Sequence, residues 1–339
     1  MQARKFTLLA RGWSWSWHTV GAQTLPPVSL GRTTKRKVEV VIIQQLASFC
    51  STHRARHHFG QRMHLVLDFD GTITQKDTIG VLVDSALAFQ RERGQDLSSR
   101  WDHVLEEYTA DAKALKESFQ PAEPMRTSLD DERRFLAAQF EVDEASLRRV
   151  AASRIFAGIE TEQYFQFGRD AVESGKVSIR SGFWQLVELA ATQGWMVHVI
   201  SVNWSRNFIA GVLHPLDPKL IITNDLSLDG AIQGPEILPR KLTSPWDKLE
   251  AFELVTASST DKVVYFGDSV NDIECLVRGG LAIADGEDTS LLRTLRRVGM
   301  QIPRLSAQTA KANLTWASNF DDFLKASNLT PPLSTEKGQ

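Results

Sequence analysis

The stretch His64–Thr74, HLVLDFDGTIT, decides the fold. Its apolar run Leu65–Leu67 is followed by a turn at Gly71, which is typical of a strand buried on both faces of a parallel sheet. Such a strand delivers the residues after it to the edge where open α/β sheets bind ligands. Asp68 and Asp70 would share a face if the strand continued, or meet around a metal ion if the chain curled there. An ordinary acidic Asp-Gly turn explains the stretch equally well, so the rest of the chain has to decide.

Composition limits the classes of protein to consider. The chain has 339 residues, 42% hydrophobic and 24% charged, which is enough for two compact units with a sizeable core. Residues 1–62 hold ten Lys or Arg and one acid, whereas the rest holds 29 basic and 40 acidic residues. Because so acidic a body is a poor non-specific nucleic-acid binder, we expect no nucleic-acid partner. No apolar run approaches the roughly 18 to 20 residues of a membrane helix, so no membrane partner is expected either.

The basic segment 1–62 shows no sustained period and predicts a disordered extension. Its composition fits a mitochondrial transit peptide, but Met63 directly before the first strand would also make a natural start. We favour the second interpretation and a cytoplasmic location, with a mitochondrial location as the alternative. Cys50 and Cys275 are the only cysteines, so no disulfide framework exists and a reducing compartment is the default.

After Thr74 the hydrophobic period changes to that of helices. Apolar residues recur at helical spacing through about residue 176, which predicts four or more amphipathic helices. A crossover between parallel strands needs one helix, and about a hundred residues is too long for that role. We therefore predict a domain organisation with four parts: an extension at 1–62, a catalytic core at 63–77 and 177–310, a helical cap at 78–176, and a C-terminal helix and tail at 311–339.

Beyond the insertion, strands and helices alternate. The strands are expected at 195–202, 220–223, 262–266 and 281–284, with an edge strand at 301–305 and a hairpin within 225–233. The helices are expected at 183–193, 206–213, from Pro245 onward, 273–278, 291–298 and 320–326. This alternation predicts an α/β fold with a Rossmann-like, three-layer parallel sheet.

Chemically useful side chains follow several of these strands. Ser201 stands at a junction between a strand and a helix, where a hydroxyl and free backbone N–H groups make a natural anion site. The strand expected at 262–266 runs into Gly267 and Asp268, and Asp272 lies four residues after Asp268, so both acids can face the same edge of the sheet. Lys248 lies one turn into the helix that begins at Pro245.

Together these motifs resemble the haloacid dehalogenase superfamily of phosphotransferases, in its phosphoserine phosphatase-like branch. The resemblance covers residues 64 to about 305 and rests on Asp68-Phe69-Asp70-Gly71-Thr72, Ser201, Lys248, and Asp268 with Asp272 in GDSVND. Lys241 competes with Lys248 for the motif lysine. We prefer Lys248 because it lies on the helix before the final strand, where the family places this residue. The resemblance implies a helical cap inserted after the first strand, a Mg²⁺ cofactor and a small-molecule phosphate ester as substrate.

The chemistry of phosphomonoester hydrolysis suits the same residues. Asp68 would attack the phosphorus and form an aspartyl-phosphate, and Asp70 would protonate the leaving group and then deprotonate water. Mg²⁺ suits an all-oxygen site, with Asp68, the Asp70 backbone carbonyl and Asp268 as metal ligands. Ser201 would hold phosphoryl oxygens, and Lys248 would neutralise charge.

The remaining predicted site residues position these groups or bind substrate. Asn271 and Asp272 would orient the lysine or the metal-bound waters. Substrate-binding residues are predicted at Asp77, Val202, Asn203 and Trp204. Asp77 would meet a cationic substrate group, as in phosphoserine phosphatases, or would simply cap a helix. A closer similarity, to the phosphatase domain of plant thiamine monophosphate phosphatases, would let Asp77 and Trp204 favour a thiazolium cation.

Two other functions compete with a Mg²⁺-dependent phosphatase. The Asp70 carboxylate suits a phosphomutase as well as a phosphatase, and the two differ in whether the phosphoryl group stays on the product. A catalytically silent binding module on the same fold is the third hypothesis, but such a module has no physical need of a complete set of catalytic residues. Oligomeric state leaves no clear mark in the sequence.

Overall fold

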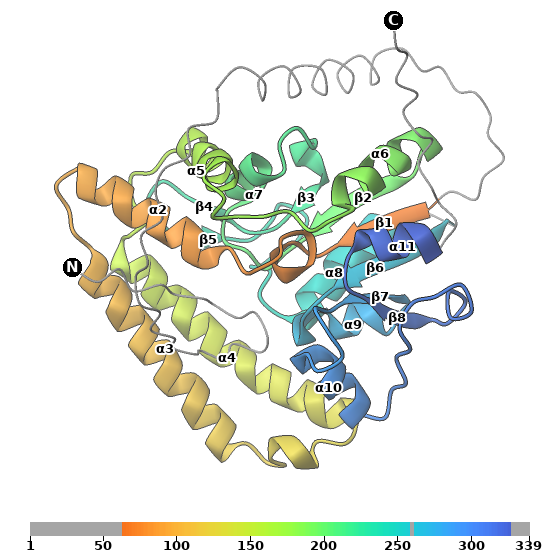
Figure 1. The fold of residues 1–339 in the computed structure, drawn as a ribbon. Helices are drawn as coiled ribbons and strands as arrows, with labels where there is room; N and C mark the ends of the chain where they lie inside the picture. Colours follow the sequence, from red (N-terminus) through yellow and green to blue (C-terminus); the bar gives the residue numbers. More distant parts are fainter. Residues whose placement is uncertain (1–62, 258–260, 327–339) are drawn as a thin grey trace, which may run out of the picture. The chain divides into compact units, whose positions relative to one another are not determined.

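The computed structural model describes residues 63–257 and 261–326 (Figure 1). The predicted extension at 1–62 and the end of the predicted tail lie outside these described residues. Within them, the chain forms a six-stranded sheet in the order β3-β2-β1-β6-β7-β8, in which all five neighbouring pairs are parallel. The strands are β1 (Met63–Leu67), β2 (Met196–Ile200), β3 (Ile221–Ile222), β6 (Lys262–Gly267), β7 (Gly280–Ile283) and β8 (Leu314–Ala317). The predicted α/β parallel-sheet fold is confirmed.

The position of β1 explains why its sequence is mostly apolar. All five of its residues are buried, and strands pair with it along both edges, so it lies in the interior of the sheet. Leu67 is in register with Val199 of β2 and with Phe266 of β6. The residues that follow these three strands therefore reach the same edge of the sheet.

Helices surround the sheet and agree with the capping signals in the sequence (Figure 1). Gly194 ends α6 in the left-handed conformation, and a Ser244–Asp247 capping box opens α8. The bounds are α6 (Phe183–Gln193), α7 (Arg206–Val212), α8 (Pro245–Thr256), α9 (Ile273–Leu276), α10 (Ser290–Arg297) and α11 (Phe320–Ala326). A separate antiparallel hairpin, β4 (Asp225–Leu226) and β5 (Ile232–Gln233), follows β3.

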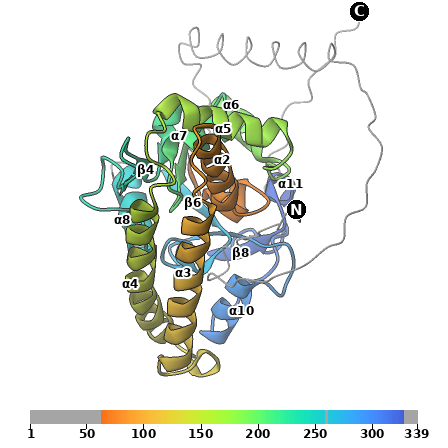
Figure 2. The same ribbon diagram turned by 90° about the vertical axis from the view of Figure 1, so that its left-hand side faces the viewer.

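Four α-helices lie between β1 and α6, where the insertion was predicted. They are α2 (Ile79–Glu92), α3 (Ser98–Ser118), α4 (Leu129–Ser153) and α5 (Thr161–Glu173). The long helices α3 and α4 lie side by side in both views (Figures 1 and 2). By contrast, α5 packs closely on α7, which belongs to the segment after β2. The insertion therefore consists of a helix pair, α3 with α4, joined to helices that pack nearer the sheet.

Ion pairs link α4 to α9 and to the segment before α8. Arg133 donates to both carboxylate oxygens of Glu274 on α9, over 2.6 and 2.9 Å. Further along α4, Glu144 accepts from the Lys241 ammonium over 2.5 Å. Lys241, the competitor for the motif lysine, is thus engaged with the insertion.

The predicted edge strand at 301–305 is wrong. This segment forms only one isolated bridge, between Arg304 and Trp316, and the edge of the sheet is β8. Pro303 lacks the N–H that a ladder requires, which explains why the segment does not extend as a strand. Since β8 lies in the part that was predicted to be only a C-terminal helix and tail, the sheet extends further along the chain than expected.

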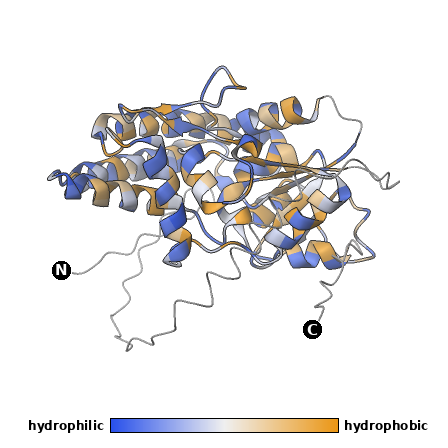
Figure 3. Cartoon of the chain, turned by 90° about the horizontal axis from the view of Figure 1, so that it is seen from above, coloured by the Kyte–Doolittle hydropathy of each residue, from blue (hydrophilic) through white to orange (hydrophobic). Residues whose placement is uncertain are grey.

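The helices carry both hydrophobic and hydrophilic residues, as expected of helices that pack on one side (Figure 3). Over 63–257 and 261–326, none of them combines the length and the apolarity needed to cross a bilayer.

Two histidines meet on adjacent strands at the centre of the sheet. The rings of His64 and His198 stack with their centroids 5.9 Å apart. His64 Nδ1 and His198 Nε2 are buried without a hydrogen-bond partner among the described residues, and Asp261 lies 3.7 Å from His64 Nε2. Burial, together with the charge of His64, lowers the pKa of His198.

We expect His198 to make the fold less stable in acid. A group whose pKa is lowered by folding takes up its proton in the unfolded state first, so stability is lost as the pH falls through about 6.5, the ordinary histidine value. The slope from this one group is at most about 1.4 kcal/mol per pH unit. Urea unfolding of wild type and His198→Val between about pH 8 and pH 5.5 measures it, because the variant should gain stability relative to wild type as the pH falls. A difference that is constant with pH would contradict the prediction.

Candidate active site

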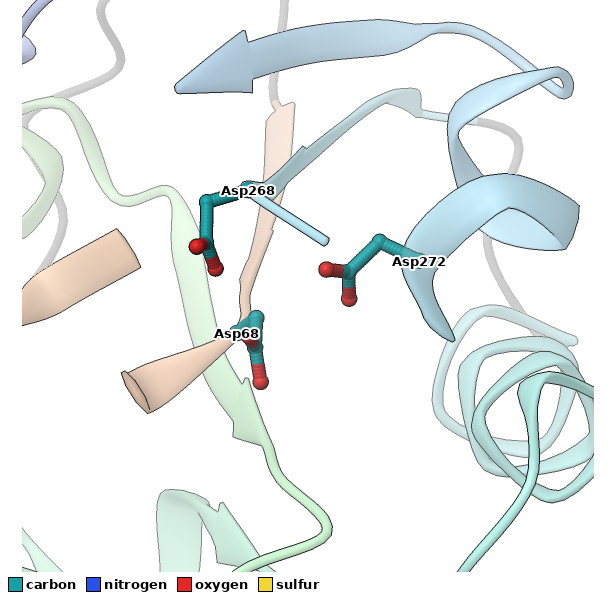
Figure 4. A group of neighbouring side chains, drawn as sticks. All are labelled: Asp68, Asp268 and Asp272. Atoms are coloured by element: carbon teal, nitrogen blue, oxygen red, sulfur yellow. The ribbon is translucent and has the colours of Figure 1, made fainter. Parts of the chain in front are cut away.

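Three aspartates converge where β1 and β6 end. Asp68 directly follows β1, Asp268 directly follows β6, and Asp272 lies in the short helical turn Val270–Asp272. One carboxylate oxygen from each lies within 4.8 Å of the others. Figure 4 shows the three side chains around one space at this edge of the sheet. The parallel register thus brings together acids that are about two hundred residues apart in sequence.

Two glycines leave room for these carboxylates. A Cβ added at Gly71 would lie 2.3 Å from Asp268 Oδ2, and Gly71 has a φ of 75°, which other residues rarely adopt. A Cβ added at Gly267 would lie 2.4 Å from Asp272 Cγ. The glycine of each motif therefore packs against an acid of the GDSVND segment. The chain curls after Asp68 into a turn over Phe69–Ile73, so the two acids of the DFD pair point to different partners.

Lys248 lies between two of the acids. Its Nζ is 2.7 Å from Asp68 Oδ1 and 2.7 Å from Asp272 Oδ1, and its side chain is 1% exposed. Asp272 also accepts from the Tyr265 hydroxyl over 2.7 Å and from the Ser269 N–H over 3.0 Å. The structure thus brings Lys248 to the acids, whereas Lys241 pairs with Glu144.

The charges in this cluster do not balance. Burial and the charge of Asp272 together raise the pKa of Asp68 to about 8, against the opposing effect of Lys248. Burial and the charge of Asp68 likewise raise the pKa of Asp268 well above its ordinary value. Although burial disfavours a charged lysine, Asp272 and Asp68 raise the pKa of Lys248, which therefore stays protonated. Two buried carboxylates and one partly buried carboxylate thus lie around a single ammonium, which contacts Asp68 and Asp272.

This donor set fits a hard divalent cation. Carboxylate oxygens are the ligands that Mg²⁺ and similar ions prefer, and added positive charge would relieve the repulsion that raises these pKa values. The oxygens of Asp272 already accept hydrogen bonds from Lys248, Tyr265 and Ser269, so Asp68 and Asp268 are the better placed ligands. The acidic cluster can therefore hold a metal ion.

The Asp70 carboxylate is turned toward neutral donors. Its Oδ1 accepts from the Thr78 N–H over 2.8 Å and from the Thr78 hydroxyl over 2.6 Å, and its Oδ2 accepts from Asn203 Nδ2 over 2.8 Å. Burial raises the pKa of Asp70, and the hydrogen bonds from Thr78 and Asn203 oppose that rise. Asp68 and Asp70 therefore stand in electrostatically different surroundings.

The other predicted residues lie near this edge but differ in their partners. Ser201 is fully buried, and its Oγ accepts the Asn203 N–H over 3.1 Å. Val202 is partly buried against a hydrophobic cluster, and Asn271 follows Ser269 in the turn before α9. Asp77 Oδ1 accepts the N–H of Ile79, the first residue of α2, over 2.9 Å, but the N-cap position itself is held by Thr78. Burial, followed by the charge of Asp70, raises the pKa of Asp77 well above its ordinary value.

Trp204 packs against the inserted helices. It is 5% exposed, and its ring meets those of Trp101 on α3 and Phe156 edge-on, with centroids 6.4 and 6.1 Å away. These contacts join the strand end at Ser201 to the insertion. In this arrangement the ring of Trp204 is a packing group, and its predicted role toward a substrate cation stays a prediction.

Arg180 is a site residue that the sequence reasoning missed. It is 7% exposed and donates to the carbonyl of Gly71 over 2.6 Å and to that of Thr72 over 3.0 Å. It also reaches Asp285 over 2.7 Å. Arg180 thus fixes the turn that follows Asp68. No local pattern marks it, because a lone arginine before a helix is most often solvated.

The chain belongs to the family of haloacid dehalogenase-like hydrolases, whose model matches residues 65–277. It is 27% identical over 233 residues to a CTO1 family protein of Schizosaccharomyces pombe, covering 63% of this chain and 78% of that protein. It is 24% identical over 289 residues to the bifunctional TH2 protein, mitochondrial, of Arabidopsis thaliana, covering 78% of this chain and 45% of that protein. The chain thus spans less than half of the TH2 protein.

Solved structures with a similar fold include a phosphoserine phosphohydrolase-like protein from Francisella tularensis. Its identity is 14% and its TM-score is 0.44, with 79% of this chain and 100% of that chain covered. A phospho-aspartyl intermediate analogue of phosphoserine phosphatase has 14% identity and a TM-score of 0.42, with 78% and 99% covered. The family match confirms the predicted superfamily and the prediction that the chain is an enzyme, a hydrolase.

Proposed function

We propose that the protein is a Mg²⁺-dependent phosphatase of small phosphomonoesters. One observation carries this proposal: the two acids of the DFD pair have different surroundings. Asp68 touches the Lys248 ammonium, whereas Asp70 is held by Thr78 and Asn203. A double displacement needs one carboxylate as nucleophile and another as acid and base, and such roles are separated by surroundings that differ in this way.

In the proposed reaction, an oxygen of Asp68 attacks phosphorus as the P–O bond of the ester breaks, which forms an aspartyl-phosphate. Asp70 gives its proton to the leaving oxygen. A water molecule then attacks the phosphorus, returns a proton to Asp70 and releases inorganic phosphate together with free Asp68. Lys248 screens the negative charge on Asp68, and the Ser201 hydroxyl is the proposed donor to phosphoryl oxygens.

Mg²⁺, held by Asp68, Asp268 and the backbone carbonyl of Asp70, would supply positive charge that offsets repulsion between the carboxylates and the phosphoryl group. Asn271 and Asp272 are proposed to orient groups around it. The family membership supports the hydrolase class, and the acidic cluster supports a metal site.

The proposed substrate class is a phosphate ester of a small primary alcohol. Thiamine monophosphate is the first candidate, because the sequence resembles thiamine monophosphate phosphatases around Asp77 and in the strand that ends at Ser201. Phosphoserine is the second candidate, from the wider branch. We retain the cytoplasm as the proposed location.

A phosphate-release screen tests this proposal. We expect wild type to release inorganic phosphate from thiamine monophosphate faster than from p-nitrophenyl phosphate, and EDTA to abolish release until excess Mg²⁺ is added. The Asp268→Asn variant should need at least about tenfold more Mg²⁺ for half-maximal rate, because it loses one charged ligand. Free phosphate distinguishes a phosphatase from a phosphomutase, which would keep the phosphoryl group on the product. Release that is independent of metal, or no release from any ester, would contradict the proposal.

A further inference from the structure

The two carboxylate oxygens of Asp70 accept different numbers of hydrogen bonds. Oδ1 accepts two bonds, from the Thr78 N–H at 2.8 Å and the Thr78 hydroxyl at 2.6 Å. Oδ2 accepts one, from Asn203 Nδ2 at 2.8 Å. Since a carboxylate oxygen offers about two acceptor positions, Oδ1 is filled and Oδ2 keeps one position. Asp70 is buried, with 6% of the residue exposed, and these three hydrogen bonds fix the orientation of its carboxylate.

All polar atoms of the Asn203 side chain take part in hydrogen bonds around Asp70 or with the chain that follows it. Its Nδ2 donates to Asp70 Oδ2 and, over 3.2 Å, to the Thr78 hydroxyl, and its Oδ1 accepts the Ser205 N–H over 3.2 Å. The residue is fully buried, and its backbone carbonyl accepts from the Thr223 hydroxyl over 2.8 Å. The polar atoms of its side chain are therefore engaged within the protein, and its predicted role in substrate binding stays a prediction.

Thr78 also hydrogen-bonds to Asp70. It is the residue before the first turn of α2, where a threonine hydroxyl commonly caps a helix N–H. Its hydroxyl makes no such cap and instead donates to Asp70. A hydroxyl has one proton, so the bond from Asn203 Nδ2 reaches its lone pair, and the three groups form a directed chain. Thr78 comes from the start of the insertion, and Asn203 comes from the segment after β2.

We propose that Asn203 and Thr78 are positioning residues, which orient Asp70 so that the open position of Oδ2 faces the leaving oxygen of the substrate. The inference rests on the proposed function. The proton on Oδ2 passes to the ester oxygen as its bond to phosphorus breaks and the bond from Asp68 forms. Without these two side chains the carboxyl group would still be present, but it would no longer be held for this transfer.

The dependence of rate on the leaving group tests this role. General acid catalysis contributes about 10²- to 10⁴-fold when the leaving group is a poor one, such as an alkoxide, whereas p-nitrophenolate leaves with little help. For Thr78→Val and Asn203→Leu, we expect kcat/KM to fall about a hundredfold with the better of thiamine monophosphate and phosphoserine, and less than about fivefold with p-nitrophenyl phosphate. Thr78→Val keeps the shape of the side chain and the hydrogen bond from the backbone N–H of residue 78 to Asp70 Oδ1. It therefore tests the inference even if Asn203→Leu does not fold.

The matched control is Thr78→Ser, which keeps the hydroxyl. It should retain kcat/KM within about threefold on both substrates, because the bond to Oδ1 can still form. The inference would be overturned if kcat/KM fell equally on both substrates in variants that unfold at the same urea concentration as wild type. Thr78 and Asn203 would then have a merely structural role. Loss of the control's activity together with that of Thr78→Val would also overturn it. If wild type cleaves neither substrate class, the proposed function fails first, and the inference fails with it.

Discussion

Replacing Asp68 with asparagine is expected to reduce turnover at least about a thousandfold, because the amide cannot attack phosphorus as a carboxylate does. The fold should be retained. Asp68 lies close to two other acids, Asp272 and Asp268, with one ammonium beside them, so removing its charge relieves repulsion within this cluster. Phosphate release measures the first effect, and urea unfolding measures the second.

The control for this substitution is Asp102→Asn, the same chemical change at an exposed position of α3. It should change neither turnover nor the urea midpoint measurably, because exposed surface substitutions rarely shift stability by more than about 0.5 kcal/mol. Turnover above about a tenth of wild type in Asp68→Asn would exclude Asp68 as the nucleophile.

The second large effect is expected from Lys248→Met. The side chain is almost completely buried between Asp68 and Asp272, and removing one partner of a buried ion pair typically costs about 3 to 5 kcal/mol. The variant should unfold at a markedly lower urea concentration than wild type and should release no detectable phosphate, since the charge on Asp68 is no longer screened.

Lys241→Met provides the comparison, because it removes a lysine that is 27% exposed and pairs with Glu144 rather than with the acids of the site. A pair that is partly exposed is worth about 1 kcal/mol or less, so this variant should lose little stability and keep its activity. Should Lys241→Met abolish phosphate release while Lys248→Met preserves it, the assignment of the two lysines would be reversed.

Local patterns in the sequence predicted much of the fold. The β-branched and aromatic runs correspond to β2 and β6, the Gly194 cap ends α6 at the expected residue, and Ser244 with Pro245 begins α8. Each of these signals lies within a few residues of the element that it specifies. β8 was missed, and what defines this short strand is its pairing with β7, a contact between segments that are distant in sequence.

The site was predictable only in part, because local sequence patterns do not show contacts between distant segments. The acids, the lysine and the serine stand at strand ends or helix starts, so topology alone brings them to one edge. The groups that orient them were not visible, since Asn203 contacts Asp70 across more than a hundred positions, and the local contact of Thr78 with Asp70 depends on how the chain turns after β1. Arg180 holds the turn at Gly71 across a similar distance. Hydrogen bonds between distant segments leave no periodic trace in a single sequence.

The close packing of Gly71 on Asp268, and of Gly267 on Asp272, bears on how natural variants of this chain should be interpreted. Neither glycine carries a functional group, so Gly→Ala at either position looks conservative when only the lost atoms are considered. The added methyl group would nevertheless displace a carboxylate of the site. An alanine variant at 71 or 267 should therefore be classified with substitutions of the aspartates themselves, as a lesion of the active site caused by an added atom.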